Sequence, residues 1–511
     1  MPSYLSPGVY VEEVQTGARP IEGVGTAVAA FVGFAGQGPF HQPTLVTSWD
    51  QYVRTFGGFD ADNYLGHAVY GYFANGGGSA YVVRVGGRRA DAAPAASPAP
   101  TPVRLGALSI AALPSADSEV TVEVADVDGE NPPEDRFRLQ VSQGGQVVET
   151  FDVSTRRNVR GYVVTQVNER SKLIQVVEQP DGPLARPDKQ TVTVPAAPRL
   201  PAAPVAAGRL DAAEYVGDLA DRTGFGGLET IDEVTMVAVP DLMSAHQRGL
   251  LDGEAVRTVQ LAMISHCEQM GDRVAVLDTP PGLGAQQVRD WRMDEAGYDS
   301  RYAALYYPWI SVFDPASGRN KLVPPSGHVA GVWARSDAER GVHKAPANEV
   351  VRGAVNLELA LSKGEQDLLN PVGVNCIRPF PGRGIRIWGA RTLTSDPAWR
   401  YLNVRRLFNF LEESILIGTQ WVVFEPNDDR LWSSIRRNIG AFLNEQWRAG
   451  ALFGRTPDEA FYVKCDRENN PRESIDLGQV VCEIGVAPVK PAEFVVFRLA
   501  QFSDSTSLIN E

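Results

Sequence analysis

Two Ala/Pro-rich stretches constrain the fold of this chain more than any other feature of its sequence. They read "RRADAAPAASPAPTP" from Arg88 and "VPAAPRLPAAPVAAG" from Val194. Segments of this composition form extended linkers rather than helices or central strands. Between them apolar and polar residues alternate with the period of β-strands, as in "EVTVEVADV", "DRFRLQVS", "QVVETFDVS", "GYVVTQVN" and "KLIQVVEQ". We therefore predict an all-β domain over residues 91–210, inserted into a larger body and facing outward.

The rest of the chain predicts an α/β and α+β body. Residues 26–90 mix strands with short helices, and a strand is expected over 81–85. Residues 211–375 alternate strand and helix patterns, including a helix over 254–270 and another near Ala285, which is typical of an α/β sheet. An α+β pattern follows from residue 376.

Two long helices are predicted after residue 376. Asp396–Pro397 is a suitable N-cap and first position for a helix that runs to about Ile417. Asp429 opens a second helix that Gly450 ends. The apolar residues of this second helix recur on one face and are Leu431, Ile435, Ile439 and Leu443.

Composition and charge exclude several classes of protein. The chain has 511 residues, 43% of them hydrophobic, a formal net charge of −14 and a pI near 5.1. A chain this acidic is not expected to coat nucleic acid or an anionic membrane. No apolar run reaches the ~18 residues of a membrane span, and the N-terminus lacks the basic and apolar regions of a signal peptide. Four cysteines without a CxxC pair predict buried, reduced thiols in a cytosolic protein.

Two short motifs resemble parts of enzymes, and both are incomplete. "LDTPPGLG", over 277–284, resembles the second phosphate-site motif of chromosome-partitioning ATPases, but the chain has no Gly-Lys dipeptide for a phosphate-binding loop. We expect Asp278 to end a buried strand instead. Ser326 and His328 suggest a serine hydrolase, yet no G-x-S-x-G elbow is present and a turn is the simpler interpretation. No His/Cys cluster has metal spacing, so we expect no catalytic residue, metal or cofactor.

A strand is predicted at each end of the chain, beyond a flexible linker. "SPGVYVEEV" has no hairpin partner near it, because the next residues are rich in Gly and Pro. Such a strand is worth ordering only if its backbone groups find partners, and addition to the sheet of another copy would supply them. Pairing within the same chain is the alternative. The residues expected to exchange are Val9, Tyr10, Val11, Glu12 and Val14 at one end, and Phe494, Val495, Val496, Phe497 and Leu499 at the other.

Several stretches, in order along the chain, make it resemble the contractile tail sheath proteins of bacteriophages and of phage-tail-like contractile injection systems. They cover residues 1–90 and about 215–511 and read "YLSPGVYVEEV", "RPIEGVGTAVAAFVG", "VTSWDQYVRTFGGF", "VPPSGHVAGVWARSDAERGVHKAPAN", "GIRIWGARTL", "WRYLNVRRLFNFLEESI", "WVVFEPND" and "IGVAPVKPAEFVVFRL". The insertion over 91–210 carries no such match.

The resemblance implies a structural subunit that is not an enzyme. Sheath proteins polymerise as stacked six-fold rings around an inner tube, and they contract to drive the tube through a target envelope. Terminal arms join neighbouring subunits by strand exchange. The implied partners are further copies of the chain, an inner tube protein, and baseplate and terminator proteins, with no nucleic acid and no direct membrane insertion. Such particles are assembled in the bacterial cytoplasm.

The same resemblance implies the domain order. A middle domain is subtilisin-like in fold without catalysis, and the C-terminal domain forms the inner wall. We expect an N-terminal arm with its linker over 1–25, the first part of the core over 26–90, the inserted β-domain over 91–210, the middle α/β domain over 211–375, the C-terminal α+β domain over 376–488 and the C-terminal arm over 489–511.

A basic stretch in the C-terminal domain has two interpretations. Residues 376–410 hold seven arginines and one acidic residue, Asp396, although the whole chain has a net charge of −14. Such a stretch commonly forms ion pairs within a protein or with a neighbour. The competing hypothesis is that Arg400, Arg405 and Arg406 contact acidic groups of the inner tube.

Two other functions remain open from the sequence. One is a static structural or adhesive protein that carries an outward β-domain, and the other is an α/β hydrolase. A phage tail, a bacteriocin-like tail and an injection system are equally compatible with the motifs.

Overall fold

The computed structural model describes residues 20–86, 103–112, 119–127, 133, 135–156, 161–171, 173–178, 186–195 and 211–497. The expected N-terminal exchange residues, Val9, Tyr10, Val11, Glu12 and Val14, lie outside these ranges, as does Leu499. Among the described residues, no helix is both long and apolar enough to cross a membrane.

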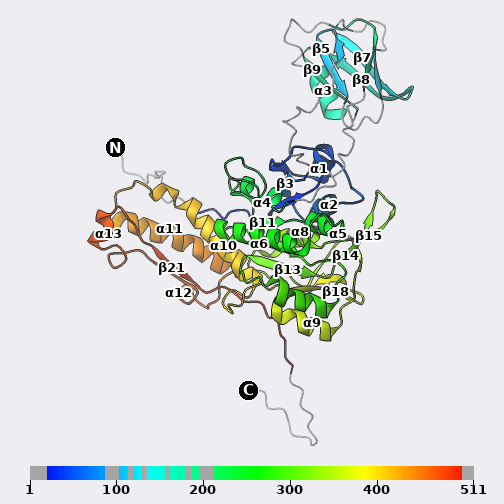
Figure 1. The fold of residues 1–511 in the computed structure, drawn as a ribbon. Coiled ribbons are helices and arrows are strands. Elements are labelled where there is room, and N and C mark those ends of the chain that lie inside the picture. The colour runs from blue at the N-terminus through cyan, green and yellow to red at the C-terminus, as the bar shows by residue number, and fades with distance from the viewer. Residues whose placement is uncertain are drawn as a thin grey trace, which may run out of the picture.

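A nine-stranded sheet forms the centre of the body (Figure 1), in the order β16-β19-β18-β13-β12-β11-β1-β3-β2. The six strands from β18 to β3 are parallel to one another, and β2 and β19 are added antiparallel at the two ends. The bounds are β1 Val28–Gly33, β2 Thr44–Val46, β3 Ser79–Arg84, β11 Met236–Ala238, β12 Val274–Asp278, β13 Ala303–Tyr307, β16 Glu349–Val350, β18 Val374–Phe380 and β19 Gly384–Ile387.

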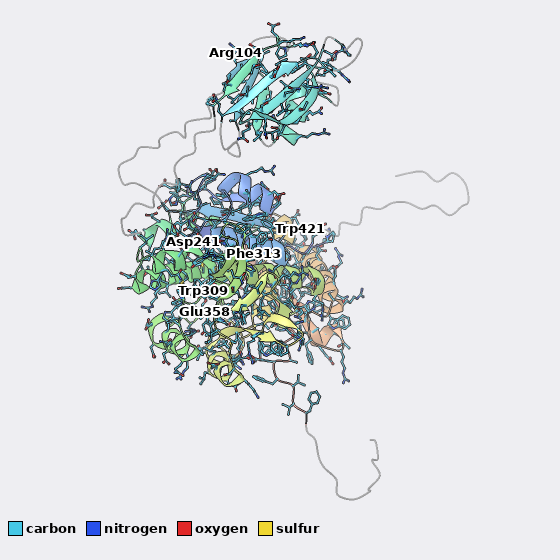
Figure 2. The ribbon with its side chains drawn as sticks, turned by 90° about the vertical axis from the view of Figure 1, so that its right-hand side faces the viewer. Arg104, Asp241, Trp309, Phe313, Glu358 and Trp421 are labelled. Carbon is cyan, nitrogen blue, oxygen red and sulfur yellow. The ribbon has the colours of Figure 1, made fainter. Side chains whose placement is uncertain are left out.

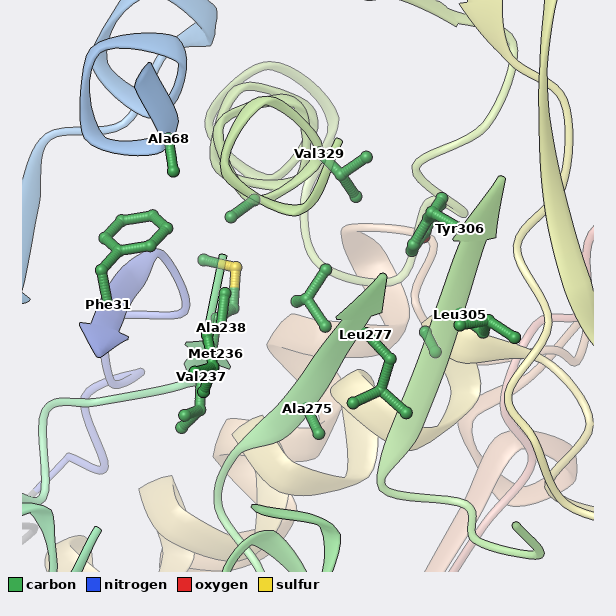
Figure 3. Packing of buried hydrophobic residues seen from close by; sticks show 14 of the residues in the cluster. Phe31, Ala68, Met236, Val237, Ala238, Ala275, Leu277, Leu305, Tyr306 and Val329 are labelled. Atoms are coloured by element: carbon green, nitrogen blue, oxygen red, sulfur yellow. The ribbon is translucent and has the colours of Figure 1, made fainter. Parts of the chain in front are cut away.

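Helices cover the apolar strands. All five residues of β12 are buried, as expected of a parallel strand packed on both faces. In Figure 3, Ala68 and Val329, from two neighbouring helices, lie over the strands that carry Phe31, Leu277 and Tyr306. The helices of this region are α1 Trp49–Phe56, α2 Leu65–Asn75, α4 Ala213–Val216, α5 Asp241–Gln247, α6 Gly253–Met270, α7 Ala285–Asp290, α8 Ser326–Arg340 and α9 Lys363–Leu369. The helices expected over 254–270 and near Ala285 are therefore present.

The sheet crosses two of the expected domain boundaries. β1, β2 and β3 belong to the first part of the core, and they continue the sheet of the middle domain through the β1–β11 pair. The expected boundary at residue 376 falls inside β18, which pairs with β13 on one side and β19 on the other. The central sheet therefore continues past residue 376, through β18 and β19. A smaller sheet, β15-β14-β17, lies beside it, with bounds β14 Ile310–Asp314, β15 Arg319–Val323 and β17 Ala354–Leu357.

Two long helices dominate the C-terminal part (Figure 1): α10 Leu402–Gly418 and α11 Asp429–Arg448. The predicted apolar face of α11 is confirmed, because Leu431, Ile435, Ile439 and Leu443 are all buried. Their core also includes Ile21 from the start of the described chain. The smaller elements here are α12 Pro457–Ala460, β20 Phe461–Lys464, α13 Arg472–Asp476 and β21 Glu483–Val486.

The first of these helices begins later than predicted. The Asp396 carboxylate accepts the N–H of Ala398 at 2.8 Å, which makes a turn rather than a helix N-cap. The Thr392 N–H then donates to the Arg400 carbonyl at 2.9 Å. The backbone just before α10 therefore pairs with the segment that follows β19 and does not form a helical turn. The predicted start at Asp396–Pro397 is wrong because this tertiary pairing outweighs a good local capping signal.

The inserted segment contains two antiparallel sheets, β10-β6-β7-β8 and β4-β5-β9. The described residues of its hydrophobic cluster all lie between Val103 and Val194. It is not all-β, because "GYVVTQVN", predicted as a strand, contributes to helix α3, which buries Val163 and Val167 one turn apart. The bounds are β4 Val103–Leu105, β5 Leu108–Ala112, β6 Val120–Ala125, β7 Arg136–Gln143, β8 Gln146–Ser154, α3 Val163–Arg170, β9 Ile174–Glu178 and β10 Thr191–Val194.

All four cysteines are free thiols, as predicted. Cys267, Cys376 and Cys465 are buried, whereas Cys482 is only partly so. Burial raises the pKa of Cys376 and of Cys482 to about 12, which keeps both thiols protonated at neutral pH.

Candidate functional site

The predicted serine and histidine pair does not form a catalytic dyad. The Ser326 hydroxyl donates to the Asp278 carboxylate at 2.6 Å, and the Ser326 N–H donates to the other oxygen of Asp278 at 2.9 Å. Asp278 ends β12, as predicted, and therefore holds the N-terminus of α8. His328 lies two residues further along α8, and burial lowers its pKa to about 4. Ser326 is fully buried, so a substrate could not reach its hydroxyl in this conformation.

A second buried carboxylate closes the place where sheets of this kind commonly bind ligands. The order of parallel strands reverses between β1 and β11, and ligands of doubly wound sheets bind at the carboxyl ends of the strands at such a point. Asp241 lies there and accepts the N–H groups of Phe34 at 2.6 Å, Leu65 at 3.2 Å, and Tyr64. Burial raises the pKa of Asp241 to about 6, although these backbone hydrogen bonds oppose the shift. The chain thus places its own carboxylate at the N-terminus of α2, where an anionic ligand would otherwise bind.

The loop after β12 is fixed in the same manner. Trp309 donates from its indole N–H to the Thr279 carbonyl at 3.0 Å, and the Gly282 N–H donates to Glu358 at 2.8 Å. The Glu358 N–H in turn donates to the Trp309 carbonyl at 3.0 Å, and these two residues lie close together in Figure 2. The phosphate-site resemblance of "LDTPPGLG" therefore corresponds to a structural turn. Among the described residues, no three His, Cys, Asp or Glu side chains are placed to hold a metal ion.

The root of the C-terminal arm is clamped to the body by Glu493. Its carboxylate accepts two hydrogen bonds from Arg391, at 2.6 and 2.8 Å, one from Asn370 at 2.8 Å and one from Tyr401 at 3.2 Å. Burial disfavours the charged form of Glu493, but the bonds from Arg391 and Asn370 outweigh burial and lower its pKa. Charge-assisted bidentate bonds of this kind are strong and geometrically specific. Glu493 therefore fixes the chain at this point on the body.

The four residues that follow this clamp are apolar and exposed. Their exposed fractions are 74% for Phe494, 69% for Val495, 76% for Val496 and 84% for Phe497. No strand is assigned to them in the described chain, although the sequence predicts one. Four consecutive large apolar residues exposed to water are unfavourable in a folded chain.

The root of the N-terminal arm lies along α10. Ile21 is buried, and a Cβ atom on Gly418 would come within 2.7 Å of its side chain. The Val24 N–H donates to the Ser414 hydroxyl at 3.1 Å, and the Thr26 hydroxyl donates to Asp337 at 2.7 Å. The chain is therefore fixed from Ile21 onward.

Helix α10 holds both arm roots. Tyr401 is its N-cap and bonds the C-terminal clamp, and Asn403 in its first turn donates to the Val489 carbonyl at 3.2 Å. Ser414 and Gly418 near its other end hold the N-terminal root. A helix of 17 residues is about 25 Å long, so the two roots are held near opposite ends of one helix.

The C-terminal part contains a small two-stranded sheet, formed by β20 and β21. The strands pair antiparallel from Phe461 with Val486 to Lys464 with Glu483. In the described chain no further strand is hydrogen-bonded to either of them. A two-stranded sheet is marginal by itself, and its open edges can accept further strands.

The predicted tube contacts are mostly used inside the chain. Arg406 and Asp337, each 4% exposed, form an ion pair at 2.6 Å. Arg405 is 1% exposed, pairs with Glu412 at 3.1 Å and lies over the rings of Tyr302 and Trp399. Arg400 is half-buried. Internal ion pairs, the first interpretation of the basic stretch, account for Arg405 and Arg406, and we do not propose these two as contacts to an inner tube.

Two family models match this chain. The phage tail sheath protein central domain matches residues 237–393, and the phage tail sheath C-terminal domain matches residues 394–502. Together they cover more than half of the chain and include β11 to β21, α10 and the C-terminal root. The chain belongs to the phage tail sheath family.

Individual relatives agree with this assignment. The tail sheath protein of Vibrio phage KVP40 is 28% identical over 243 residues, which is 45% of this chain and 35% of the relative. The tail sheath protein of Salmonella phage ViI is 29% identical over 253 residues, 47% of this chain and 39% of the relative. The matched part thus spans well under half the length of these two relatives.

Solved structures match over nearly the whole length. The helical sheath of the anti-feeding prophage in its contracted state gives a TM-score of 0.60 at 25% identity, covering 98% of this chain and 100% of the other. The sheath complex of an extracellular contractile injection system, PVC, also in a contracted state, gives 0.59 at 24% identity, covering 98% of this chain and 99% of the other. The fold is therefore that of contractile sheath subunits.

Sequence reasoning missed the residues of the C-terminal clamp. Arg391 was counted only as one of seven basic residues, and its partner Glu493 lies 102 residues later. The available signal was a lone acidic residue directly before four apolar ones, "EFVVF". No sequence pattern marks Asn370 and Tyr401, because their hydrogen bonds to Glu493 form only when folding brings these distant residues together.

Proposed function

We propose that this chain is a structural subunit of a contractile tail sheath, without enzymatic activity. It polymerises as stacked six-fold rings around an inner tube protein, with a baseplate at one end and a terminator at the other, and it contracts to drive the tube through a target envelope. Membership of the sheath family and the match to contracted sheaths along 98% of the chain support this function. The particle is assembled in the bacterial cytoplasm.

The terminal arms link the subunits by strand exchange. The observation that supports strand exchange is that Glu493 is held by Arg391 and is followed directly by four exposed apolar residues, Phe494 to Phe497. Each buried Val or Phe contributes about 1.5–3 kcal/mol, and each ladder hydrogen bond adds about 0.5–1.5 kcal/mol net. The C-terminal arm, with Leu499, and the N-terminal arm, through Val9, Tyr10, Val11, Glu12 and Val14, add to the β20–β21 sheet of neighbouring copies.

The remaining parts have supporting roles. The central sheet acts as a rigid body, because its ligand-binding edge is filled by Asp241 and its loop after β12 is hydrogen-bonded. The inserted domain over 91–210 faces outward. Contraction keeps the arms paired while the bodies change their packing between two discrete states.

One experiment tests the proposal. The full chain is produced with its inner tube protein and viewed by negative-stain microscopy, and we expect long striated tubes together with short, wide ones. A variant that ends at Glu493 keeps the clamp and loses the exposed arm, so it should remain folded and form no tubes. Tubes of one fixed width that never shorten would indicate a static assembly instead. Normal tubes from the truncated chain would refute strand exchange by this arm.

A further inference from the structure

An exposed aromatic side chain protrudes from the loop between α10 and α11. Phe424 is fully exposed, at 102% of its reference area, and its neighbour Val423 is 66% exposed. The backbone of Phe424 has a φ of +68°, which is unfavourable for a bulky side chain. A residue held in such a conformation and turned into water indicates a function outside the folding of its own chain.

The loop that carries this ring is anchored. Asn427 accepts the indole N–H of Trp432 at 2.8 Å and donates to the Gln479 carbonyl at 2.9 Å. The Glu425 N–H donates to the Val422 carbonyl at 3.1 Å. Trp421, labelled in Figure 2, is partly buried against the C-terminal core. The ring is therefore presented by a fixed loop, and docking it would cost little conformational entropy.

A cavity of about 380 Å³ lies at the N-terminal arm root. Val24, Gly25 and Val28 of the root, Phe410 and Ile417 of α10, and Val342 supply its apolar lining. This volume lies within the range of about 300–1,000 Å³ of pockets that bind small organic molecules, so it can accept a phenyl ring.

Acidic groups restrict what this cavity can bind. Asp232, Glu233, Asp272 and Glu413 also line it, together with Arg406, whose guanidinium is paired with Asp337. Burial, with the charges of Asp272 and Asp232, raises the pKa of Glu413, so a further negative charge would be repelled. The four carboxylates disfavour an anionic ligand such as a nucleotide, and the apolar part of the lining is the surface that an aromatic ring can contact.

We propose that Phe424 of one copy docks into the cavity at the arm root of a second copy. The ring is fully exposed in its own chain, so it does not fill its own cavity. A protruding apolar group and a fitting pocket at different places on one chain make a heterologous contact, which repeats from copy to copy into a ring or a helix. This inference rests on the proposed sheath function, and it adds a contact between subunit bodies to the exchange of arms.

Two substitutions test the two sides of the contact. Phe424→Ser removes the ring, and Gly25→Leu adds a side chain at a residue that lines the cavity, where no atom lies within 4 Å of an added Cβ. Each should reduce the mass of sedimentable tubes at least tenfold while the folded chain remains soluble. The matched controls are Phe313→Ser, at a ring 56% exposed on β14 and labelled in Figure 2, and Gly364→Leu, another glycine with open space. Both controls should assemble normally.

A cross-linking experiment keeps the test decisive if one variant folds poorly. A chain with Glu425→Cys and Gly25→Cys should give a ladder of disulfide-linked oligomers in assembled tubes. A mixture of the two single variants should stop at dimers. Glu425→Cys combined with Gly364→Cys is the control pair and should give no ladder.

The outcomes separate this inference from the function beneath it. If the unmodified chain forms no tubes with its tube protein, the proposed function fails and the inference fails with it. If unmodified tubes form, and Phe424→Ser and Gly25→Leu also assemble fully, only the inference is overturned. If Phe424→Ser fails to assemble but the double-cysteine chain gives no ladder of disulfide-linked oligomers, the ring contacts another site. This result would also overturn the inference.

Discussion

Two buried carboxylates, Asp241 and Asp278, lie at the carboxyl edge of the central sheet and hold the N-termini of helices. Burial raises the pKa of Asp278 from its ordinary value of 3.8 to about 7, although the hydrogen bonds from Ser326 oppose the shift. At a pH between 3.8 and about 7, Asp278 therefore binds a proton more readily in the folded chain than in the unfolded chain. The contribution of Asp278 to stability is therefore fully present below pH 3.8 and is lost as the pH rises through about 7.

The substitution Asp278→Asn should therefore act differently at acidic and alkaline pH. An asparagine can still accept the Ser326 N–H and donate to its hydroxyl, but it carries no charge. Relative to the unmodified chain, the variant should gain about 2–4 kcal/mol in free energy of unfolding between pH 5 and pH 8. Urea unfolding followed by tryptophan fluorescence measures this difference. An equal difference at both pH values would contradict the assigned cause.

Glu493→Gln tests the clamp of the C-terminal arm. The variant leaves the Arg391 guanidinium without its ion-pair partner, which costs about 1–3 kcal/mol at the arm root. The unfolding midpoint of the body should change little, because the clamp joins only the arm to it, while the yield of tubes should fall severalfold. Glu295→Gln, at an exposed position, is the matched control. A normal yield of tubes from Glu493→Gln would show that the clamp is not needed for assembly.

Single residues mark the limit of sequence reasoning here. Asp278 was correctly placed at the end of a buried strand, because apolar residues before it and Pro-Pro after it are local signals. The partners of Arg405 and Arg406 could not be predicted in the same manner. Asp337 precedes Arg406 by 69 residues, and only folding brings the two within 2.6 Å.

At the scale of elements, α10 is where local and tertiary signals disagree. The local capping signal at Asp396–Pro397 predicts a start that is wrong, because the pairing of Arg400 with Thr392 places the start of the helix at Leu402. In the inserted domain, Val163 and Val167 fit both a strand period and a helix period, and the packing of α3 decided between them. Long periodic elements such as α11 were predicted well because their pattern has no competing interpretation.

The contact between α10 and the N-terminal root is tested by Gly418→Ala. A Cβ there would come within 2.7 Å of Ile21, so the root must shift, at a cost of about 1–3 kcal/mol. Hydrogen exchange of the Val24 amide, which bonds Ser414, should become roughly ten- to a hundredfold faster. Gly440→Ala is the control: it has open space in the middle of α11 and should stabilise that helix by up to ~1 kcal/mol. Unchanged exchange at Val24 would show that Ile21 accommodates the added methyl group.

At the scale of the molecule, the sequence predicts an inserted segment, but it does not predict that strands on both sides of the insertion form one sheet. The Ala/Pro stretches bracket the inserted segment in the sequence, and its apolar residues form a cluster of their own. The central sheet, in contrast, takes strands from residues 28 to 387. Parallel pairing joins β1 to β11 across the whole insertion, and no local pattern reports which distant strands become neighbours.

Deletion of residues 91–210 is the corresponding test for the whole molecule. A short Gly/Ser linker replaces them, and the body should fold unchanged, because its two hydrophobic clusters contain none of the described residues of the insertion. All nine tryptophans lie outside the insertion, so their fluorescence reports on the body alone, and its urea midpoint should be preserved. The shortened chain should still form tubes, and their outer diameter should decrease, because the proposed position of the insertion is on the outer surface. Loss of folding would show that the body depends on the insertion, and tubes of unchanged diameter would place the insertion elsewhere.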